Sequence, residues 1–363
     1  MNFNTKSIIS TNKFFKTIVV LYFIATTFMS NLCAQIGGNN TYEFLNLNSD
    51  ARIAAMGGTF ISVIDNDLST GLQNPALLQQ QLNNKITLAA TDYLTDIKYG
   101  SIGYARHYNK TGTFAASLKY VNYGDFTQTD EFASILGNFD AAEYALQISY
   151  GAPFQGDSAF TYGFALKGIY SKLADYTSTG LAADAGVSYT NTARLITMSL
   201  LVKNVGVQLK KYTSGAKEKL PVEVQFGISK RLGKAPFRFN LNINNMQQWD
   251  ITYPNGSSTQ ETDPQTGEVI EKKNSFFTKA IRHCVPGIEL LLSKNFHIRA
   301  AYNFQRRNEL GVQTSMKAVG FNFGLGIKLS KFNFSYARSI YHLAGATNHF
   351  TVAFDMDDFY RKK

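Results

Sequence analysis

A regular alternation of apolar and polar side chains runs through most of the chain, from Lys85 to Met356. The stretch from Val222 to Ser229 shows it clearly, because every second residue is apolar and those between are Glu, Gln, Gly and Ser. A β-strand repeats every two residues, so each such stretch has one apolar face and one polar face. Each stretch is about ten residues long, which at ~3.3 Å per residue matches the apolar band of a membrane β-barrel.

The alternation predicts an all-β fold with about fourteen antiparallel strands. Thr179–Thr190 is the weakest of them, because it is rich in Ala and Gly. The predicted spans are Lys85–Tyr93, Lys98–Tyr108, Gly112–Tyr123, Glu143–Pro153, Phe160–Lys172, Thr179–Thr190, Arg194–Asn204, Lys219–Arg231, Phe237–Gln248, Cys284–Leu292, Phe296–Asn308, Gly320–Leu329, Phe332–Ser339 and Asn348–Met356.

Short and long connections follow one another along the series of strands. A transmembrane up-and-down barrel of the outer membrane has this pattern, with short periplasmic turns and long extracellular loops. The short connections are Asn109–Thr111, Phe154–Ala159, Asn191–Ala193, Leu232–Pro236, Ser293–Asn295 and Ser330–Lys331. The long ones are Leu94–Ile97, Gly124–Ala142, Leu173–Ser178, Val205–Lys217, Trp249–His283, Glu309–Val319 and Ile340–Thr347.

Residues 1–34 have the three parts of a secretory signal peptide. Three lysines precede an apolar stretch from Ile18 to Phe28, and Ala34 supplies a small residue at the cleavage site. The apolar stretch is too short for a membrane helix, which needs about 20 residues. Lipid attachment through Cys33 is the alternative to cleavage after Ala34, and the bulky Leu32 disfavours it.

Export narrows the choice of fold. Cleavage removes three lysines and no acid, so the formal net charge falls from +10 to about +7. Cys284 then has no second cysteine to form an internal disulfide. No other apolar run is long enough for a spanning helix. Such a chain can enter a bilayer only as a closed barrel, because open sheet edges are too costly there. We expect no nucleic-acid partner.

A soluble β-sandwich or propeller is the alternative to the membrane barrel, because its strands also alternate. No blade-length repeat supports a propeller. Aromatic residues gather near the predicted strand ends, where a barrel has its interfacial girdles. These residues are Tyr93, Tyr99, Tyr108, Tyr123, Tyr150, Phe160, Tyr170, Tyr189, Trp249, Phe296 and Tyr341. Together with the alternating connection lengths, they favour the membrane.

A barrel of about fourteen strands is too wide for its inward side chains to fill. Residues 35–84 precede the first strand and do not alternate, so they are the candidate lumenal plug. The expected organisation is a signal peptide (1–34), a plug or hatch (35–84), a transmembrane barrel (85–356) and a C-terminal tail (357–363). The candidate plug residues combine glycines, acids and an Asn-Pro turn: Gly57, Gly58, Asp65, Asp67, Asn74, Pro75 and Ala76.

This N-terminal segment resembles two related families. A Gly-rich stretch, an acidic cluster and Asn-Pro-Ala before the first strand resemble the hatch of the FadL-type family, whose members are fourteen-stranded barrels with a plugged lumen. Residues 37–47, running into Ala51–Gly58, are more closely similar to the PorQ family of the type IX secretion system of Bacteroidetes. The likeness is most specific in Gly37–Leu78. Elsewhere it concerns architecture and length, so the related PorV family stays open.

The PorQ resemblance implies a non-enzymatic outer-membrane component of the type IX protein secretion system. The implied partners are a PorZ-like surface protein and PorU and PorV-like components, besides the lipid bilayer and lipopolysaccharide. The FadL resemblance implies the alternative, an outer-membrane channel for a hydrophobic small molecule. The inward faces that can be assigned are polar, which disfavours an apolar pocket: Glu223, Gln225, Arg238, Asn240, Asn242 and Lys328.

The sequence holds no pattern typical of catalysis or of a bound cofactor. Its five histidines are scattered, with no H-E-x-x-H motif and no paired Cys/His spacing, so we expect no metal site. His349 and Asp355 share a predicted strand, but a lumenal histidine accounts for His349 more simply than a catalytic triad.

Two long loops are candidate docking surfaces. In Gly124–Ala142, helical i, i+3, i+4, i+7 spacing predicts a short amphipathic helix. In Trp249–His283, a turn-rich polar part precedes Phe276 and Phe277. Apolar residues on exterior loops cover the lumen, dock a partner or fold back onto the rim. In Gly124–Ala142, the apolar residues with helical spacing are Phe132, Ile135, Leu136 and Phe139. Lysine and arginine pairs beside the loops, such as Lys210-Lys211 and Arg306-Arg307, suit lipopolysaccharide phosphates, or are simply solvated.

Overall fold

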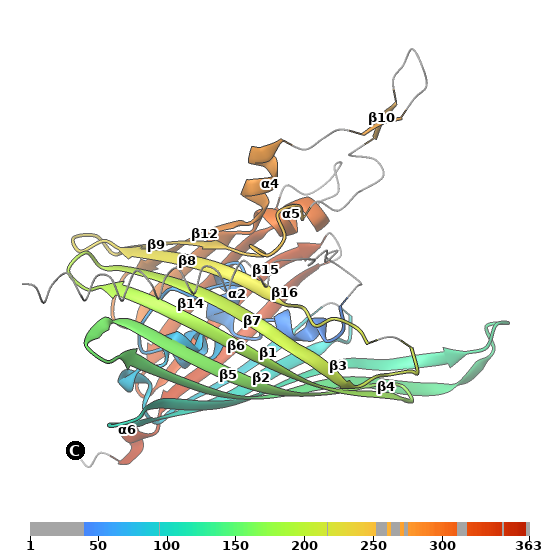
Figure 1. Ribbon diagram of the computed structural model, residues 1–363, viewed down its shortest axis with the longest axis horizontal. Coiled ribbons are helices and arrows are strands. Elements are labelled where there is room, and N and C mark those ends of the chain that lie inside the picture. Colours follow the sequence, from blue (N-terminus) through green and yellow to red (C-terminus); the bar gives the residue numbers. More distant parts are fainter. Residues whose placement is uncertain are drawn as a thin grey trace, which may run out of the picture. The chain divides into compact units, whose positions relative to one another are not determined.

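The structure is a computed structural model that describes residues 40–93, 95–215, 217–251, 260–262, 269–271, 275–310, 318–342 and 345–360. The predicted signal peptide lies outside these residues, as does most of the turn-rich polar part of Trp249–His283. The described chain forms a β-barrel with short helices in its lumen (Figure 1).

Fourteen of the described strands close into one antiparallel barrel. β1 closes it, because Lys85 pairs with Ala105 of β2 on one side and with Asp355 of β16 on the other. The strands are β1 Lys85–Asp92, β2 Lys98–Tyr108, β3 Gly112–Thr129, β4 Ile135–Phe154, β5 Asp157–Leu173, β6 Tyr176–Asn191, β7 Ile196–Lys210, β8 Glu223–Arg231, β9 Phe237–Ile243, β12 Cys284–Leu291, β13 Phe296–Tyr302, β14 Phe321–Leu329, β15 Phe332–His342 and β16 Gly345–Asp355.

Each predicted strand corresponds to one strand of the barrel, so the predicted fold class is confirmed. Two predicted strands are too long at their C-terminal ends. β9 stops at Ile243, and β13 stops at Tyr302, after which the helix α5 (Phe304–Leu310) begins. The Asn303 side chain accepts a hydrogen bond from the Arg306 amide (2.9 Å), which caps the first turn of α5.

The amphipathic helix predicted in Gly124–Ala142 is wrong. β3 continues to Thr129 and β4 begins at Ile135, so the segment is a long β-hairpin with its turn at residues 130–134. Phe126 pairs with Phe139, and their rings stack 5.1 Å apart. The helical spacing of the apolar residues is a coincidence, since cross-strand aromatic pairs stabilise the hairpin instead.

The two ends of the barrel differ. β1 begins and β16 ends at one end, and the tight turns 109–111, 155–156 and 330–331 lie there too; we call it the short-turn rim. The opposite end, the long-loop rim, carries the β3–β4 hairpin and the connection 244–283. That connection contains α4 (Phe276–Arg282) and the paired strands β10 (Gln260–Thr262) and β11 (Val269–Glu271).

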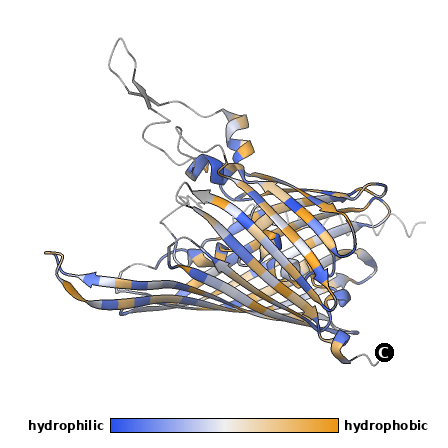
Figure 2. Cartoon of the chain, turned by 180° about the vertical axis from the view of Figure 1, so that it is seen from behind, coloured by the Kyte–Doolittle hydropathy of each residue, from blue (hydrophilic) through white to orange (hydrophobic). Residues whose placement is uncertain are grey.

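Hydrophilic and hydrophobic residues are interspersed along the strands of the barrel (Figure 2). Large apolar side chains project outward from alternate positions, including Leu88, Ile102, Leu118, Leu146, Ile148, Phe164, Leu166, Leu181, Leu200, Phe239, Phe323, Leu325, Phe334 and Phe350. A soluble β-fold would bury so many apolar groups, whereas a bilayer solvates them. The described part of the chain has no helix long and apolar enough to cross a membrane.

The lumen is polar along the wall and contains the N-terminal segment, residues 40–84. Its elements are η1 (Glu43–Asn46), α2 (Ala51–Ala55), α3 (Leu68–Gln73), η2 (Pro75–Leu77) and η3 (Gln80–Leu82). Inward side chains of the wall that are buried against the segment or each other include Thr87, Ser149, Lys167, Asp184, Gln225, Asn242, Glu289, Asn322 and His349.

Candidate functional site

The N-terminal segment contacts the inner wall around most of its circumference. α2 packs on β13 to β16, α3 on β1 and β2, and η2 on β4, β5 and β6. Near its start, Tyr42, Phe44 and Leu45 are buried among Val121 and Ile169 of the wall. The segment therefore has its own apolar contacts and is held from several sides.

Arg52 of α2 is the centre of a buried ion-pair network. Its side chain is 4% exposed. The guanidinium lies 2.6 Å from Asp65 and 3.0 Å from Asp67, both in the N-terminal segment, and 3.0 Å from Glu289 of β12. The structure thus brings together the two acids chosen from the sequence and joins them to the barrel wall.

Two arginines of the wall complete this network. Arg238 of β9 lies 2.6 Å from Glu289 and 3.2 Å from Asp65, and Arg299 of β13 lies 2.8 Å from Glu289. Three guanidiniums therefore face three carboxylates, of which Glu289 is fully buried and Asp65 and Asp67 are half-buried. Removing one partner from a buried pair typically costs about 3–5 kcal/mol, because the other charge is left uncompensated.

The network sets the protonation of the acids in the N-terminal segment. Burial alone would raise the pKa of Asp65, but Arg52 and Arg238 outweigh it and hold that pKa below its ordinary value of 3.8. Asp50 differs, because burial and the nearby Asp67 raise its pKa. Asp50 caps α2 by accepting hydrogen bonds from the amides of Arg52 and Ile53.

The turn Asn74–Ala76 packs against glycines of three adjacent strands, which we call the glycine seat. Gly151 of β4, Gly163 of β5 and Gly186 of β6 are paired in register across the wall. A Cβ atom at Gly163 would collide with the Pro75 backbone, and one at Gly186 would collide with the Asn74 side chain. The wall therefore lacks side chains where η2 approaches it.

Gly57 and Gly58 end α2 in the left-handed region, with φ of +85° and +95°. A Cβ atom at Gly57 would also collide with Val285 of β12. The Gly57 carbonyl accepts a hydrogen bond from the Asn303 side chain (3.1 Å). Both positions need glycine for their backbone conformation, and Gly57 needs it also for its close approach to the wall.

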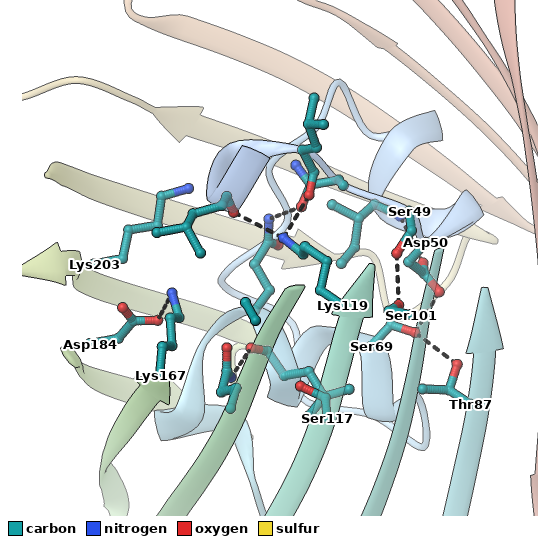
Figure 3. Close-up of a pocket in the computed structure, with 18 residues that line it drawn as sticks. Ser49, Asp50, Ser69, Thr87, Ser101, Ser117, Lys119, Lys167, Asp184 and Lys203 are labelled. Atoms are coloured by element: carbon teal, nitrogen blue, oxygen red, sulfur yellow. Dashed lines mark hydrogen bonds and ion pairs between the residues drawn. The ribbon is translucent and has the colours of Figure 1, made fainter. Parts of the chain in front are cut away.

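A cavity of about 90 Å³, which we call the lysine cavity, lies between the N-terminal segment and the wall. Lys119, Lys167 and Lys203 reach it from β3, β5 and β7, while Ser69, Asp50 and Ser101 lie on its other side (Figure 3). A second, larger cavity of about 430 Å³ is lined by residues that include Val63, Asp157 and Arg231. Both cavities are lined by polar as well as apolar side chains.

The candidate docking residues of the β3–β4 hairpin lie at its tip. Phe132, Ile135 and Leu136 are 82%, 73% and 62% exposed, whereas Phe139 is half-buried against Phe126. Figure 1 shows β3 and β4 extending beyond the neighbouring strands of the barrel. The tip therefore presents apolar side chains away from the wall.

Phe276 and Phe277 lie on α4, in the other candidate loop, and both remain more than 70% exposed. Phe276 packs on Trp249 at a ring distance of 4.8 Å, and Trp249 in turn stacks on His283. α4 also contacts α5. The loop base is thus ordered by aromatic contacts, while its apolar surface faces outward.

The histidine considered for catalysis has ordinary structural partners. His349 is buried and its Nδ1 lies 2.9 Å from Thr91 Oγ1, whereas Asp355 pairs with Lys85 at 3.1 Å. Among the described residues, no group of three or more His, Cys, Asp or Glu side chains could hold a metal ion.

Sequence reasoning missed Arg52 of the N-terminal segment and several residues that face this segment from the wall. These wall residues are Glu289, Arg299 and the three cavity lysines. Their signal is a charged residue at an inward position of a strand whose outward positions are apolar, since such a charge needs a partner in the lumen. The sequence analysis placed Arg238 on an inward face but did not identify its partner, Glu289.

The fold and site define a class: a transmembrane β-barrel of the outer-membrane type, with an N-terminal segment in its lumen. The structure is similar to the toluene transporter TbuX of Ralstonia pickettii (10% identity, TM-score 0.49, 85% of this chain and 98% of that one). It is also similar to a FadL homologue of Pseudomonas aeruginosa (10% identity, TM-score 0.46, 85% and 98%). A mutant of the monoaromatic hydrocarbon channel TodX shows a comparable likeness (12% identity, TM-score 0.48, 84% and 96%).

At these identities the likeness concerns the fold alone. No protein-family model matches the sequence, and no curated protein matches it either. The resemblance to the PorQ family thus has no support from these sequence comparisons.

Proposed function

We propose that this protein is a non-enzymatic docking component of a secretion apparatus in the outer membrane. The observation that carries the proposal is the β3–β4 hairpin, whose exposed tip residues Phe132, Ile135 and Leu136 lie beyond the barrel wall. Exposed apolar groups on a projecting element are typical of protein interaction sites. The PorQ resemblance makes the type IX system the apparatus and a PorZ-like surface protein the partner, beside PorU and PorV-like components.

Charge and strand pairing support a protein partner for this hairpin. Residues 123–141 contain Asp125, Asp130, Glu131 and Asp140 and no lysine or arginine. Such a surface repels the anionic lipopolysaccharide and suits a basic protein surface. In addition, β2 pairs with β3 only as far as Asn122, and β5 pairs with β4 only as far as Ala141. Beyond these residues, the hairpin edges have no strand partner in the described part of the chain, and only the Ala174 amide donates to the Asp140 carbonyl (3.2 Å), so another strand has room to add there.

The lumen supports the same role. The N-terminal segment is fastened to the wall by Arg52, Glu289 and the glycine seat, so the barrel serves as a rigid membrane anchor. The wall around the segment is polar, which suits a hydrophobic permeant poorly.

Mild-detergent purification of the tagged protein tests the proposal. Changing Phe132, Ile135, Leu136 and Phe139 together to Ser should leave heat-modifiable folding of the barrel intact and reduce recovery of a PorZ-like partner about tenfold or more, since anchor residues of an interface typically contribute over 1 kcal/mol each. A matched control changes the polar hairpin residues Thr127, Gln128 and Asn138 to Ser and should keep the partner. Equal recovery with both variants rules out the hairpin as the docking surface.

The second candidate is a channel for a hydrophobic small molecule, the activity named for TbuX and TodX. One feature of the barrel wall favours this channel function. β7 pairs with β8 only as far as Lys203 and Glu223, although β7 continues to Lys210. Beyond that point side-chain hydrogen bonds join β7 to residues that precede β8, from Asn204 to the Pro221 carbonyl (3.1 Å) and from the Glu218 amide to Gln208 (3.2 Å). A moving N-terminal segment could open a path there.

Native mass spectrometry of the purified protein separates the two candidates. A docking component should be recovered with a protein partner and without a stoichiometric hydrophobic ligand. A protein recovered alone with one bound apolar molecule would favour the channel.

A further inference from the structure

The lysine cavity gathers three lysines on one side, and one of them lacks a carboxylate partner. Lys167 pairs with Asp184 (2.6 Å) and Lys203 pairs with Glu223 (2.9 Å). Within the described part of the chain Lys119 has no carboxylate partner. Its ammonium group donates to the Leu45 and Leu47 carbonyls of the N-terminal segment, at 2.9 and 2.8 Å. Lys119 is half-buried, and a cation that is partly removed from water is stabilised by a nearby anion.

The negative group on the opposite side of the cavity does not complete it. Asp50 is occupied as the N-cap of α2 and accepts a hydrogen bond from Ser69 at 2.5 Å. Figure 3 shows Asp50 grouped with Ser69, Thr87 and Ser101, whereas the lysines project from the other strands. Asp50 therefore does not serve as the anionic partner of Lys119.

The cavity also has the donors and the size that a small anion needs. An ammonium group has three donors, so Lys119 keeps one after its two carbonyl bonds and Lys203 keeps two after Glu223. Gln73 and Asn48 line the same space, but their amide nitrogens already donate to the Gly58 carbonyl. A volume of about 90 Å³ holds a small anion with a few waters and excludes a long acyl chain.

We propose that the lysine cavity binds one small oxyanion of the phosphate or carboxylate class, with Lys119 as its central ligand. Charge-assisted hydrogen bonds from lysine to such oxygens are short and strong. Because Lys119 also holds the Leu45 and Leu47 carbonyls, the bound anion fastens the N-terminal segment to β3, β5 and β7. This site does not depend on the docking role, since it lies in the lumen and involves no residue of the hairpin.

Thermal unfolding of the folded protein in detergent tests the site, with sodium phosphate and sodium acetate as probes and sodium chloride at equal ionic strength as the reference. The wild type should show a saturable rise of its midpoint with both oxyanions. Lys119→Gln should lose about tenfold in apparent phosphate affinity, the loss expected for one charge-assisted hydrogen bond. Lys119→Arg should retain most of it. Lys328→Gln, which changes an exposed lysine of β14, should behave like the wild type.

Two results overturn the proposal. One is that the unfolding midpoint of the wild type shows no saturable rise with the oxyanions. The other is that Lys119→Gln shows the same rise as the wild type, which would mean an adventitious ion only. If Lys119→Gln does not yield a heat-modifiable barrel, the wild-type titration against chloride decides alone. Native mass spectrometry of the same preparations identifies the source. A bound mass equal to phosphate indicates a free anion, a bound lipid mass indicates a headgroup, and either supports an oxyanion site.

Discussion

Single charged residues decide how firmly the N-terminal segment is held in the lumen. Arg52 is almost completely buried and contacts carboxylates of both the segment and the wall. Its planar guanidinium has five N–H donors in a fixed geometry that matches carboxylates, whereas a lysine would offer three donors on a single nitrogen. By contrast, the exposed pair of Lys172 and Asp140 near the hairpin adds little, because water screens it.

Arg52→Ala should therefore release residues 50–67 from the wall. We expect a loss of about 3–5 kcal/mol, because Asp65, Asp67 and Glu289 lose a shared buried partner. Hydrogen exchange of this stretch should rise in the variant while exchange of the barrel strands stays low. Lys172→Ala is the matched control and should leave exchange unchanged. Equal protection in Arg52→Ala and wild type would show that the network does not hold the segment.

The same network predicts an acid-labile attachment of the segment. The pKa of Asp65 is held below its ordinary value of 3.8, so its stabilising effect is fully present above pH 3.8 and is lost as the pH falls through the lowered pKa. Asp50 acts in the opposite sense, since with a raised pKa its uptake of a proton stabilises the folded segment as the pH falls. Hydrogen exchange of residues 50–67 should therefore not increase from pH 7 to 4, after correction for the intrinsic rate, and should increase only below pH 3.8. An increase near pH 5 would contradict this assignment.

At the scale of elements, the strands were predictable because each carries its own pattern. A membrane on the outside and a polar lumen on the inside enforce a period of two, even in the Ala- and Gly-rich strand β6. The β3–β4 hairpin was not predictable as strand, since its spacing of Phe132, Ile135, Leu136 and Phe139 also fits a helix. The contacts between the segment and the wall were not predictable either, because no local pattern tells which inward glycine faces which turn.

The glycine seat gives a test of one such contact. Gly163→Ala should push η2 off β5 and cost about 1–3 kcal/mol, since the new Cβ meets the Pro75 backbone. Gly168→Ala lies on the same strand and meets nothing within 4 Å, so it is a matched control. The melting midpoint in the heat-modifiability assay should fall for Gly163→Ala alone. Equal midpoints for both variants would show that η2 does not need this seat.

At the scale of the whole molecule, the barrel has two unlike ends, and the features that suit a partner are all at the long-loop rim. The hairpin and α4 project from that rim, whereas tight turns close the other one. If the short-turn rim faces the periplasm, as the signal peptide and turn lengths predict, the hairpin reaches into the space outside the cell. The barrel then acts as an anchor, and the proposed function depends on what touches the hairpin.

Site-specific photo-cross-linking in intact cells measures that contact most directly. A photoreactive residue in place of Ile135, at the hairpin tip, should give one discrete cross-link to a PorZ-like surface protein. The same residue in place of Leu166, which projects from the outer face of β5, should give cross-links to lipid alone. Cross-links from position 135 to lipid or lipopolysaccharide alone, or none at all, would contradict the docking role.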